Sequence, residues 1–207
     1  MAGYGLRPVG MGYGGLAGYN NGGFVEVPIS TDAAVDIFCG DFVEYVNDAT
    51  GAGSAGVVRQ ANDATGETPT TGTANTMGVA IGFRYKTSAG TPTWSQWYDQ
   101  SASNTEAFAF VCTEPNQLYL IQSDGAITIE DIGKNAPVDG FAVAEASTFT
   151  GNSGIQLDFS DLAVTAADAI RVVGIPDNGS NRGSDNPDVL VRVNTAVLFS
   201  DQGTGIV

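Results

Sequence analysis

The stretch IFCGDFVEYV at residues 37–46 carries the pattern that decides the fold of this 207-residue chain. Its residues are mostly β-branched or aromatic, and turn-forming residues bound it, which predicts a β-strand. Gly40 interrupts the run, so we expect a bulge or a bend here rather than one straight strand. The segment FVEVPIS, at residues 24–30, has the same composition and predicts a strand just before it.

Runs of the same kind continue along the chain and are separated by segments of Gly, Asn, Asp, Thr and Ser. The further predicted strands are VVRQ (57–60), MGVAIGFRY (77–85), FAFVC (108–112), LYLIQ (118–122), ITIEDI (127–132), FAVAEA (141–146), IQLDF (155–159), IRVVGI (170–175) and VLVRVNTAVLF (189–199). Only DLAVTAADAI, at residues 161–170, predicts a helix of any length, and a single short turn is the alternative there. Many short strands with almost no helix predict an all-β sandwich or barrel.

The first 23 residues differ in composition from the rest of the chain. Nine of them are glycine, which cannot form a stable helix alone. The large side chains between the glycines are Tyr4, Leu6, Tyr13, Leu16 and Tyr19. We therefore divide the chain into a flexible, glycine-rich N-terminal arm at residues 1–23 and a β-sandwich or barrel body at residues 24–207. Composition leaves two interpretations of the arm open: a segment that becomes ordered on another surface, or a plain flexible tail.

The charge balance excludes several classes of function. The chain has 23 acidic and 8 basic residues, no histidine and a formal charge of −15. Without histidine there is no Ser-His-Asp relay and no histidine metal ligand. The scattered basic residues argue against nucleic acid as a partner, because phosphate binding needs clustered Lys and Arg. No segment is apolar for long enough to predict a membrane helix or a secretory signal, so we expect a soluble protein made in the cytoplasm.

Enzymatic and metal-binding motifs are weak in this sequence. A glycosidase needs a pair of carboxylates, but no motif separates the candidates from solvated surface acids. These candidates are Glu114, Asp124, Glu130, Asp131 and Asp139. Serines are plentiful but no G-x-S-x-G motif is present, and neither Cys39 nor Cys112 has a histidine to activate it. We predict two buried free thiols in preference to a disulfide, and we predict no enzyme and no cofactor.

The loop DNGSNRGSDNPD, at residues 177–188, is the best candidate for a calcium site. Its possible oxygen ligands are Asp177, Asn181, Asp185 and Asp188. The glycines lie at the third and seventh positions rather than the sixth, so the loop is not an EF-hand. A plain solvated loop is the favoured interpretation, and we predict no metal.

Three aromatic residues lie close together in TPTWSQWYDQ, at residues 91–100. Trp94, Trp97 and Tyr98 are expected on a loop, where aromatic side chains can stack on sugar rings or anchor a protein interface. They can equally pack under the loop as a small satellite core. No basic residue lies within this group, which argues against stacking on nucleic-acid bases.

The order of several short motifs along the whole chain resembles that of tailed-bacteriophage virion proteins of the head-decoration, or capsid cement, kind. The matching motifs are Gly5-Leu6-Arg7-Pro8-Val9, Val27-Pro28-Ile29, Gly40-Asp41-x-Val43, Gly78-Val79-x-x-Gly82-Phe83, VCTEPNQLYLIQSDG (111–125), Asp131-x-Gly133-x-Asn135-Ala136, Gly154-x-Gln156-Leu157-Asp158, Arg171-Val172-Val173-Gly174-x-Pro176-Asp177 and Val189-Leu190-Val191-Arg192-Val193-Asn194. The arm is richer in glycine than this family pattern, and the aromatic segment at residues 94–98 is not part of it.

The resemblance implies a non-enzymatic structural protein on the outer surface of the capsid, whose partner is the major capsid protein. It implies a symmetric homo-oligomer as well, with a homotrimer expected first and a dimer next. Arm residues expected to contact the capsid are Tyr4, Leu6, Arg7, Tyr13, Leu16 and Tyr19. The alternative function is a receptor- or glycan-binding virion module that uses Trp94, Trp97 and Tyr98.

Overall fold

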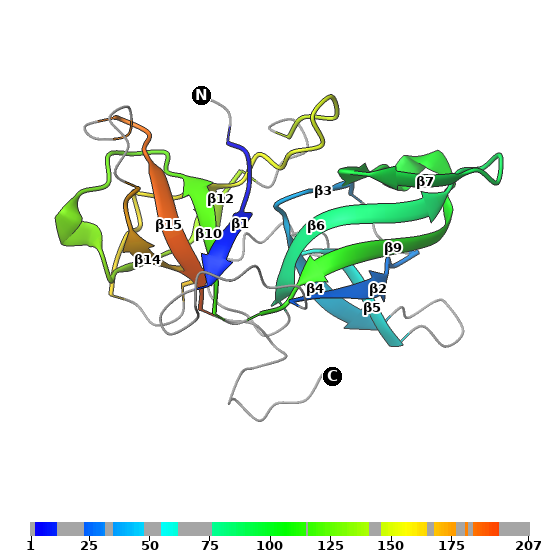
Figure 1. Ribbon diagram of the computed structural model, residues 1–207, viewed down its shortest axis with the longest axis horizontal. Helices are drawn as coiled ribbons and strands as arrows, with labels where there is room; N and C mark the ends of the chain where they lie inside the picture. The colour runs from blue at the N-terminus through cyan, green and yellow to red at the C-terminus, as the bar shows by residue number, and fades with distance from the viewer. Residues whose placement is uncertain are drawn as a thin grey trace.

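The chain forms two β lobes that lie side by side along its long axis (Figure 1). The computed structural model describes residues 3–11, 23–31, 35–47, 55–61, 76–114, 116–140, 146–164, 168–176, 181 and 184–194. The middle lobe is built from residues 24–112, and the terminal lobe from residues 3–11 together with residues 117–194. Among the described residues, no helix is both long enough and apolar enough to cross a membrane.

The middle lobe is a small barrel of antiparallel strands. Its main sheet has the order β2 (Phe24–Pro28), β9 (Thr105–Cys112), β6 (Thr76–Lys86), β4 (Phe42–Asn47) and β5 (Ala55–Gln60), and β7 (Pro92–Ser95) pairs with the far end of β6. A parallel bridge between Ile29 and Val58 brings the two edges together, so that the sheet closes on itself. The side chains inside include Val27, Val43 and Phe83. Closure leaves each strand with one face in this core and one face outside.

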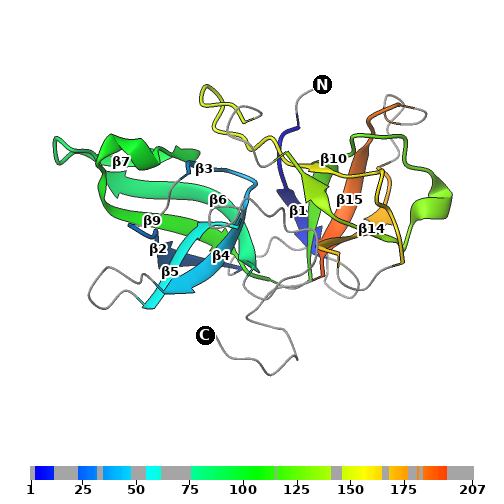
Figure 2. The ribbon, with the colours of Figure 1, turned by 180° about the vertical axis from the view of Figure 1, so that it is seen from behind.

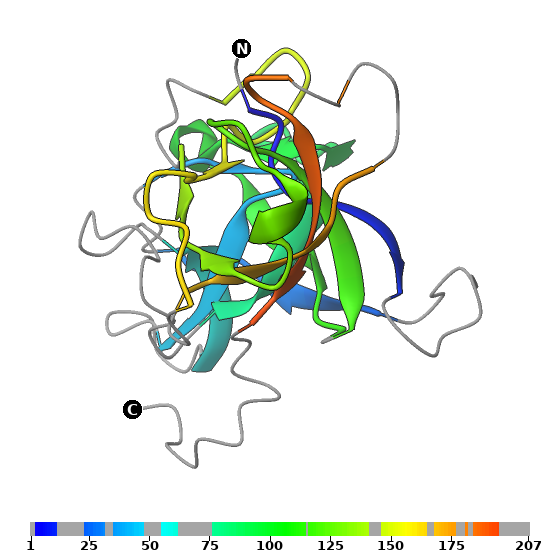
Figure 3. The same cartoon turned by 90° about the vertical axis from the view of Figure 1, so that its left-hand side faces the viewer.

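The terminal lobe is a second closed arrangement of strands. Its five-stranded sheet has the order β1 (Arg7–Met11), β10 (Gln117–Gln122), β15 (Asp188–Val193), β14 (Ile170–Gly174) and β11 (Asn135–Ala136). After Pro137 the chain enters β12 (Val138–Asp139), which pairs with β13 (Gln156–Leu157). A parallel bridge from Leu157 to Ser123 returns this pair to the end of β10. Figure 2 and Figure 3 show these strands from behind and from the side of the terminal lobe.

The all-β prediction is confirmed, and most predicted strands are present with shifts of a few residues at their ends. ITIEDI is wrong as a strand, because Asp131 caps a 3₁₀ helix, η2 (Ile129–Asp131), by accepting hydrogen bonds from Thr128. The helix predicted over 161–170 is absent from its described residues, since Ala163 forms a bridge with Asn135. The predicted strand at 141–146 lies almost wholly outside the described residues.

The aromatic segment predicted as a loop instead contributes two strands. These are β7 and β8 (Trp97–Tyr98), of which β8 pairs with β3 (Ile37–Phe38). A short 3₁₀ helix, η1 (Gln100–Ala102), follows β8. The segment is therefore ordered by cross-strand pairing, which local composition does not reveal.

The first residues of the predicted arm belong to the folded body. Arg7 to Met11 form β1 and pair with β10, and Leu6 is only 1% exposed within the core of the terminal lobe. The prediction of one flexible arm over residues 1–23 is therefore wrong for residues 3–11, because apolar burial and strand pairing hold them. Residues 12–22 lie outside the described residues.

The two lobes meet where Gly5 crosses the turn at Gly40. The amide of Leu6 donates to the Gly40 carbonyl at 3.1 Å, and the Gly40 amide donates to the Ala80 carbonyl at 2.8 Å. A Cβ atom on Gly40 would lie 2.9 Å from the Gly5 Cα, and Gly40 has a φ of +99°. The interruption predicted at Gly40 is confirmed as a bend, and it permits contact between the backbones of the two lobes. We call Gly5, Leu6, Gly40, Asp41 and Ser153 the lobe junction.

Replacing Gly40 should destabilise the protein by more than the strain of placing a side chain at a positive φ explains. We expect Gly40→Ala to lower the free energy of unfolding by at least about 2 kcal/mol more than Gly133→Ala does. Gly133 is the matched control because its φ is +94° and a Cβ there would meet nothing within 4 Å. Urea denaturation of both variants measures the difference, and equal losses would show that the close approach at Gly40 is unimportant.

Candidate interaction surface

Asp41 is the most deeply buried acidic group among the residues that the structure describes, and it ties the lobe junction together. Its Oδ2 accepts hydrogen bonds from the Phe38 amide and from Gln60 Nε2, each at 2.8 Å. Burial raises the pKa of Asp41 to about 6, although hydrogen bonds from Ser153, Phe38 and Gln60 oppose this rise. A raised pKa can mark a catalytic acid. Here the partners are structural donors from both lobes, so the carboxyl group holds the junction.

Stability should therefore depend on pH through Asp41. The folded-state pKa of about 6 lies above the ordinary value of 3.8, so the folded protein retains a proton that the unfolded chain releases. This contribution is complete below about pH 4 and is lost as the pH rises through 6. Between about pH 4 and about pH 7, we expect the free energy of unfolding to fall about 3 kcal/mol more for the native protein than for Asp41→Asn. Urea denaturation at several pH values would measure this, and parallel pH profiles would contradict it.

Each of the five candidate carboxylates has either a local hydrogen-bond partner or an exposed position in the structure. Asp131 serves as the cap of η2, and although burial pushes its pKa up, hydrogen bonds from Lys134 and Thr128 hold it below the usual range. Asp124 accepts a hydrogen bond from the Phe159 amide, and Asp139 accepts one from the Gly140 amide. Glu114 lies beside the Asn116 amide, and Glu130 is exposed. These carboxylates either order their own loops or face solvent.

Two of the candidate calcium ligands, Asn181 and Asp188, take part in internal hydrogen bonds. Asn181 is buried and uses its amide group to hold the backbone of Pro176 and Asp188. The Asp188 carboxylate accepts the Tyr4 hydroxyl at 2.7 Å, and Asp185 is exposed. Asp177 lies outside the described residues. No group of three or more Cys, Asp or Glu side chains in the described ranges could hold a metal ion.

The two cysteines are free thiols, as predicted, but the prediction that both are buried is wrong for Cys39. Cys112 is buried, whereas Cys39 is only half-buried beside the lobe junction. Burial raises the pKa of the Cys39 thiol, with a further rise from the nearby Asp41 carboxylate. A raised pKa keeps a thiol protonated and unreactive.

The residues proposed to contact a capsid are divided between the folded body and the undescribed segment. Tyr4 donates its hydroxyl to Asp188, and its pKa is raised by burial and by this bond. Arg7 lies 4.3 Å from the centre of the Tyr4 ring and is exposed. Leu6 is buried in the terminal lobe, so its assignment as a capsid contact is wrong: its side chain is already packed in this chain's own core. Tyr13, Leu16 and Tyr19 lie outside the described residues.

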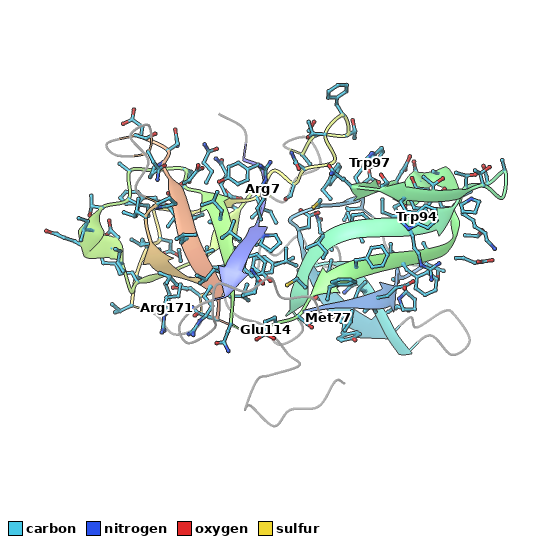
Figure 4. The ribbon with its side chains drawn as sticks, in the orientation of Figure 1. Arg7, Met77, Trp94, Trp97, Glu114 and Arg171 are labelled. Carbon is cyan, nitrogen blue, oxygen red and sulfur yellow. The ribbon has the colours of Figure 1, made fainter. Side chains whose placement is uncertain are left out.

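The three predicted aromatic residues do not share one surface. The Trp97 ring stacks on Phe38, with the ring centres 5.7 Å apart, and Tyr98 is buried in the middle lobe beside Phe83 and Tyr85. Trp94 by contrast is 71% exposed. Figure 4 shows Trp94 toward the end of the middle lobe that lies farther from the terminal lobe. The satellite-core interpretation thus describes Trp97 and Tyr98, while Trp94 is free to contact a partner.

Trp94 belongs to a larger apolar surface on the outside of the middle lobe. Cross-strand register places Pro28 of β2 opposite Phe108 of β9, Phe108 opposite Arg84 of β6, and Arg84 opposite Trp94 of β7. Directly opposed residues in antiparallel strands point to the same side of the sheet. The neighbouring row adds Phe110, whose ring is met edge-on by Phe24. We call this surface the aromatic face: Phe24, Pro28, Arg84, Trp94, Phe108 and Phe110.

Arg84 of the aromatic face and three charged residues on the same strands, Glu26, Lys86 and Glu106, form ion pairs with one another. Arg84 forms an ion pair with Glu26 and lies 4.1 Å from the centre of the Phe108 ring. Lys86 pairs with Glu106 at 2.5 Å. Two bases and two acids leave the face without net charge, which distinguishes it from a chain with a formal charge of −15. A contiguous apolar and neutral surface of this kind suits binding to another protein.

Comparison with known proteins adds no assignment to this site. No protein-family model, no curated protein and no solved structure matches the chain. Trp94 was recognisable as a candidate from the sequence, but the rest of the aromatic face was not. The available signal was the alternation in residues 107–111, where Phe108 and Phe110 alternate with small or β-branched residues.

Proposed function

We propose that this protein is a non-enzymatic capsid decoration protein, which binds the outer surface of a tailed-phage head and stabilises contacts between coat subunits. The observation that carries the proposal is that several of the family-like motifs lie close together in the structure. Gly5-Leu6, Gly40-Asp41 and Gly154 lie far apart in sequence, yet they converge at or beside the lobe junction. Several motifs that resemble those of decoration proteins therefore form the contact between the two lobes. This placement supports an architecture shared with decoration proteins.

The segment at residues 12–22 is the proposed contact with the shell. It connects Met11, at the end of β1 in the terminal lobe, with Gly23, just before β2 in the middle lobe. Both of its ends are held by strand pairing, so ordering it on a surface costs less entropy than ordering a free arm. Tyr13, Leu16 and Tyr19 are the side chains that this segment offers to pockets of the major capsid protein.

The charge of the protein supports a position on the outside of a head. A formal charge of −15 opposes contact with packaged DNA and makes random contacts between copies repulsive. Decoration then depends on several weak contacts made by each copy or oligomer. Linked sites of this kind can raise overall binding by a factor on the order of 10² to 10⁴.

Binding to heads should depend on the 12–22 segment. We expect the native protein to co-sediment with heads purified without it, and a Tyr13→Ser, Leu16→Ser, Tyr19→Ser variant to bind at least about tenfold more weakly. The matched control replaces three apolar side chains that are exposed elsewhere, in the variant Ile129→Ser, Phe149→Ser, Val164→Ser. This control should bind as the native protein does, because it leaves the 12–22 segment intact.

Two results would contradict different parts of the proposal. Failure of the native protein to bind heads, or its location inside the particle or on the tail in images of whole virions, would overturn capsid decoration. Native binding with an unaffected triple variant would retain decoration but reject the 12–22 segment as the contact.

A further inference from the structure

The aromatic face is built for a protein partner rather than for a polysaccharide. Sugar rings stack on the open faces of aromatic side chains, but Arg84 covers the face of Phe108, and Phe24 meets the Phe110 ring edge to face. Trp94 is 71% exposed and Phe24 is 49% exposed. Exposed aromatic rings beside packed aromatics and paired charges are the composition of a protein interface, in which a tryptophan can anchor a dry centre.

The charges on the aromatic face are arranged so that the face is complementary to itself. The strand order across it is β2, β9, β6 and β7. The two acids, Glu26 and Glu106, lie on β2 and β9, and the two bases, Arg84 and Lys86, both lie on β6. A second copy can be turned by 180° about an axis that lies in the plane of the face and runs along the strands. The acids of that copy would then lie against these bases. Such a distribution is what an isologous two-fold interface requires.

The rest of the molecule restricts where two copies can approach. Each copy carries a formal charge of −15, so random contacts between copies are repulsive. The aromatic face combines exposed apolar side chains with two acids and two bases that cancel, so it offers a contact without that repulsion. Phe108, Arg84 and Trp94 lie farther along the strands than Val79 and Cys112, which pack against the terminal lobe. Phe24 is opposite Cys112 but is still 49% exposed, so contact between the lobes leaves the face open.

We propose that the aromatic face is a two-fold dimerisation surface whose occupant is the aromatic face of a second copy of this chain. Trp94 of each copy packs on Phe108 and Pro28 of the other, and Arg84 and Lys86 exchange or share their acidic partners across the interface. Of the two oligomers expected from the sequence, this surface favours the dimer. The inference concerns the isolated protein and does not depend on capsid binding.

The first experiment measures association of the full chain by sedimentation equilibrium over a wide range of concentrations. We expect a dimer with a dissociation constant on the order of 1 to 100 μM. Trp94→Ser and Phe24→Ser should each weaken it by at least about tenfold. Ile129→Ser is the matched control, because Ile129 is 76% exposed on η2 of the terminal lobe and should leave the dimer unchanged. Circular dichroism checks that each variant is folded.

A charge-reversal experiment tests the two-fold arrangement itself. Arg84→Glu alone and Glu26→Arg alone should each weaken self-association. A mixture of these two variants should recover most of the loss as a heterodimer, because the reversed charges are then complementary only across the interface. Arg59→Glu is the control for added negative charge. Arg59 lies on β5 and pairs with Glu44 on β4, and neither residue belongs to the aromatic face. It should have a much smaller effect on association.

Several results would overturn the proposal. These are a protein that stays monomeric at every concentration, a trimer, or a dimer that Trp94→Ser and Phe24→Ser leave intact. Binding of the monomer to a glycan panel, lost in Trp94→Ser, would assign the face to a carbohydrate instead. None of these outcomes bears on head binding through residues 12–22, so the two proposals fail separately.

Discussion

The close crossing of Gly5 and Gly40 is the contact on which the arrangement of the two lobes depends. Two backbones can approach this closely only where neither residue carries a side chain, and Gly40 also occupies the left-handed region. The polar groups of the crossing are paired: the Leu6 amide with Gly40, the Gly40 amide with Ala80, and the Asp41 carboxylate with donors from Phe38 and Gln60. Pairing makes burial of these groups tolerable, because an unpaired buried polar group is costly.

This constraint accounts for the raised pKa values of two groups near the junction, because the contact between the lobes buries them. The buried Asp41 and the half-buried Cys39 are used, or shielded, by the contact between lobes. The middle lobe presents the neutral aromatic face on its outer surface, where the paired strands β2, β9, β6 and β7 lie side by side.

The candidate surface was only partly predictable because local composition does not encode strand register. The sequence singled out Trp94, Trp97 and Tyr98 together, since they are neighbours in the chain. In the fold, the pairing of β8 with β3 places Trp97 against Phe38, whereas the pairing of β7 with β6 leaves Trp94 beside Arg84. Alternate residues of a strand point to opposite faces, so neighbours in sequence separate and distant residues meet.

The amino-acid pattern by itself determined the all-β class, most strand positions, the bend at Gly40 and the strongly acidic character, because these follow from local propensity and composition. Tertiary structure alone decided that Leu6 lies in a core, that Gly5 meets Gly40 and that the chain closes into two lobes. Each of these depends on pairing between segments far apart in the chain. Such pairing is selected by the total burial and hydrogen bonding of the whole fold, which no single stretch of sequence contains.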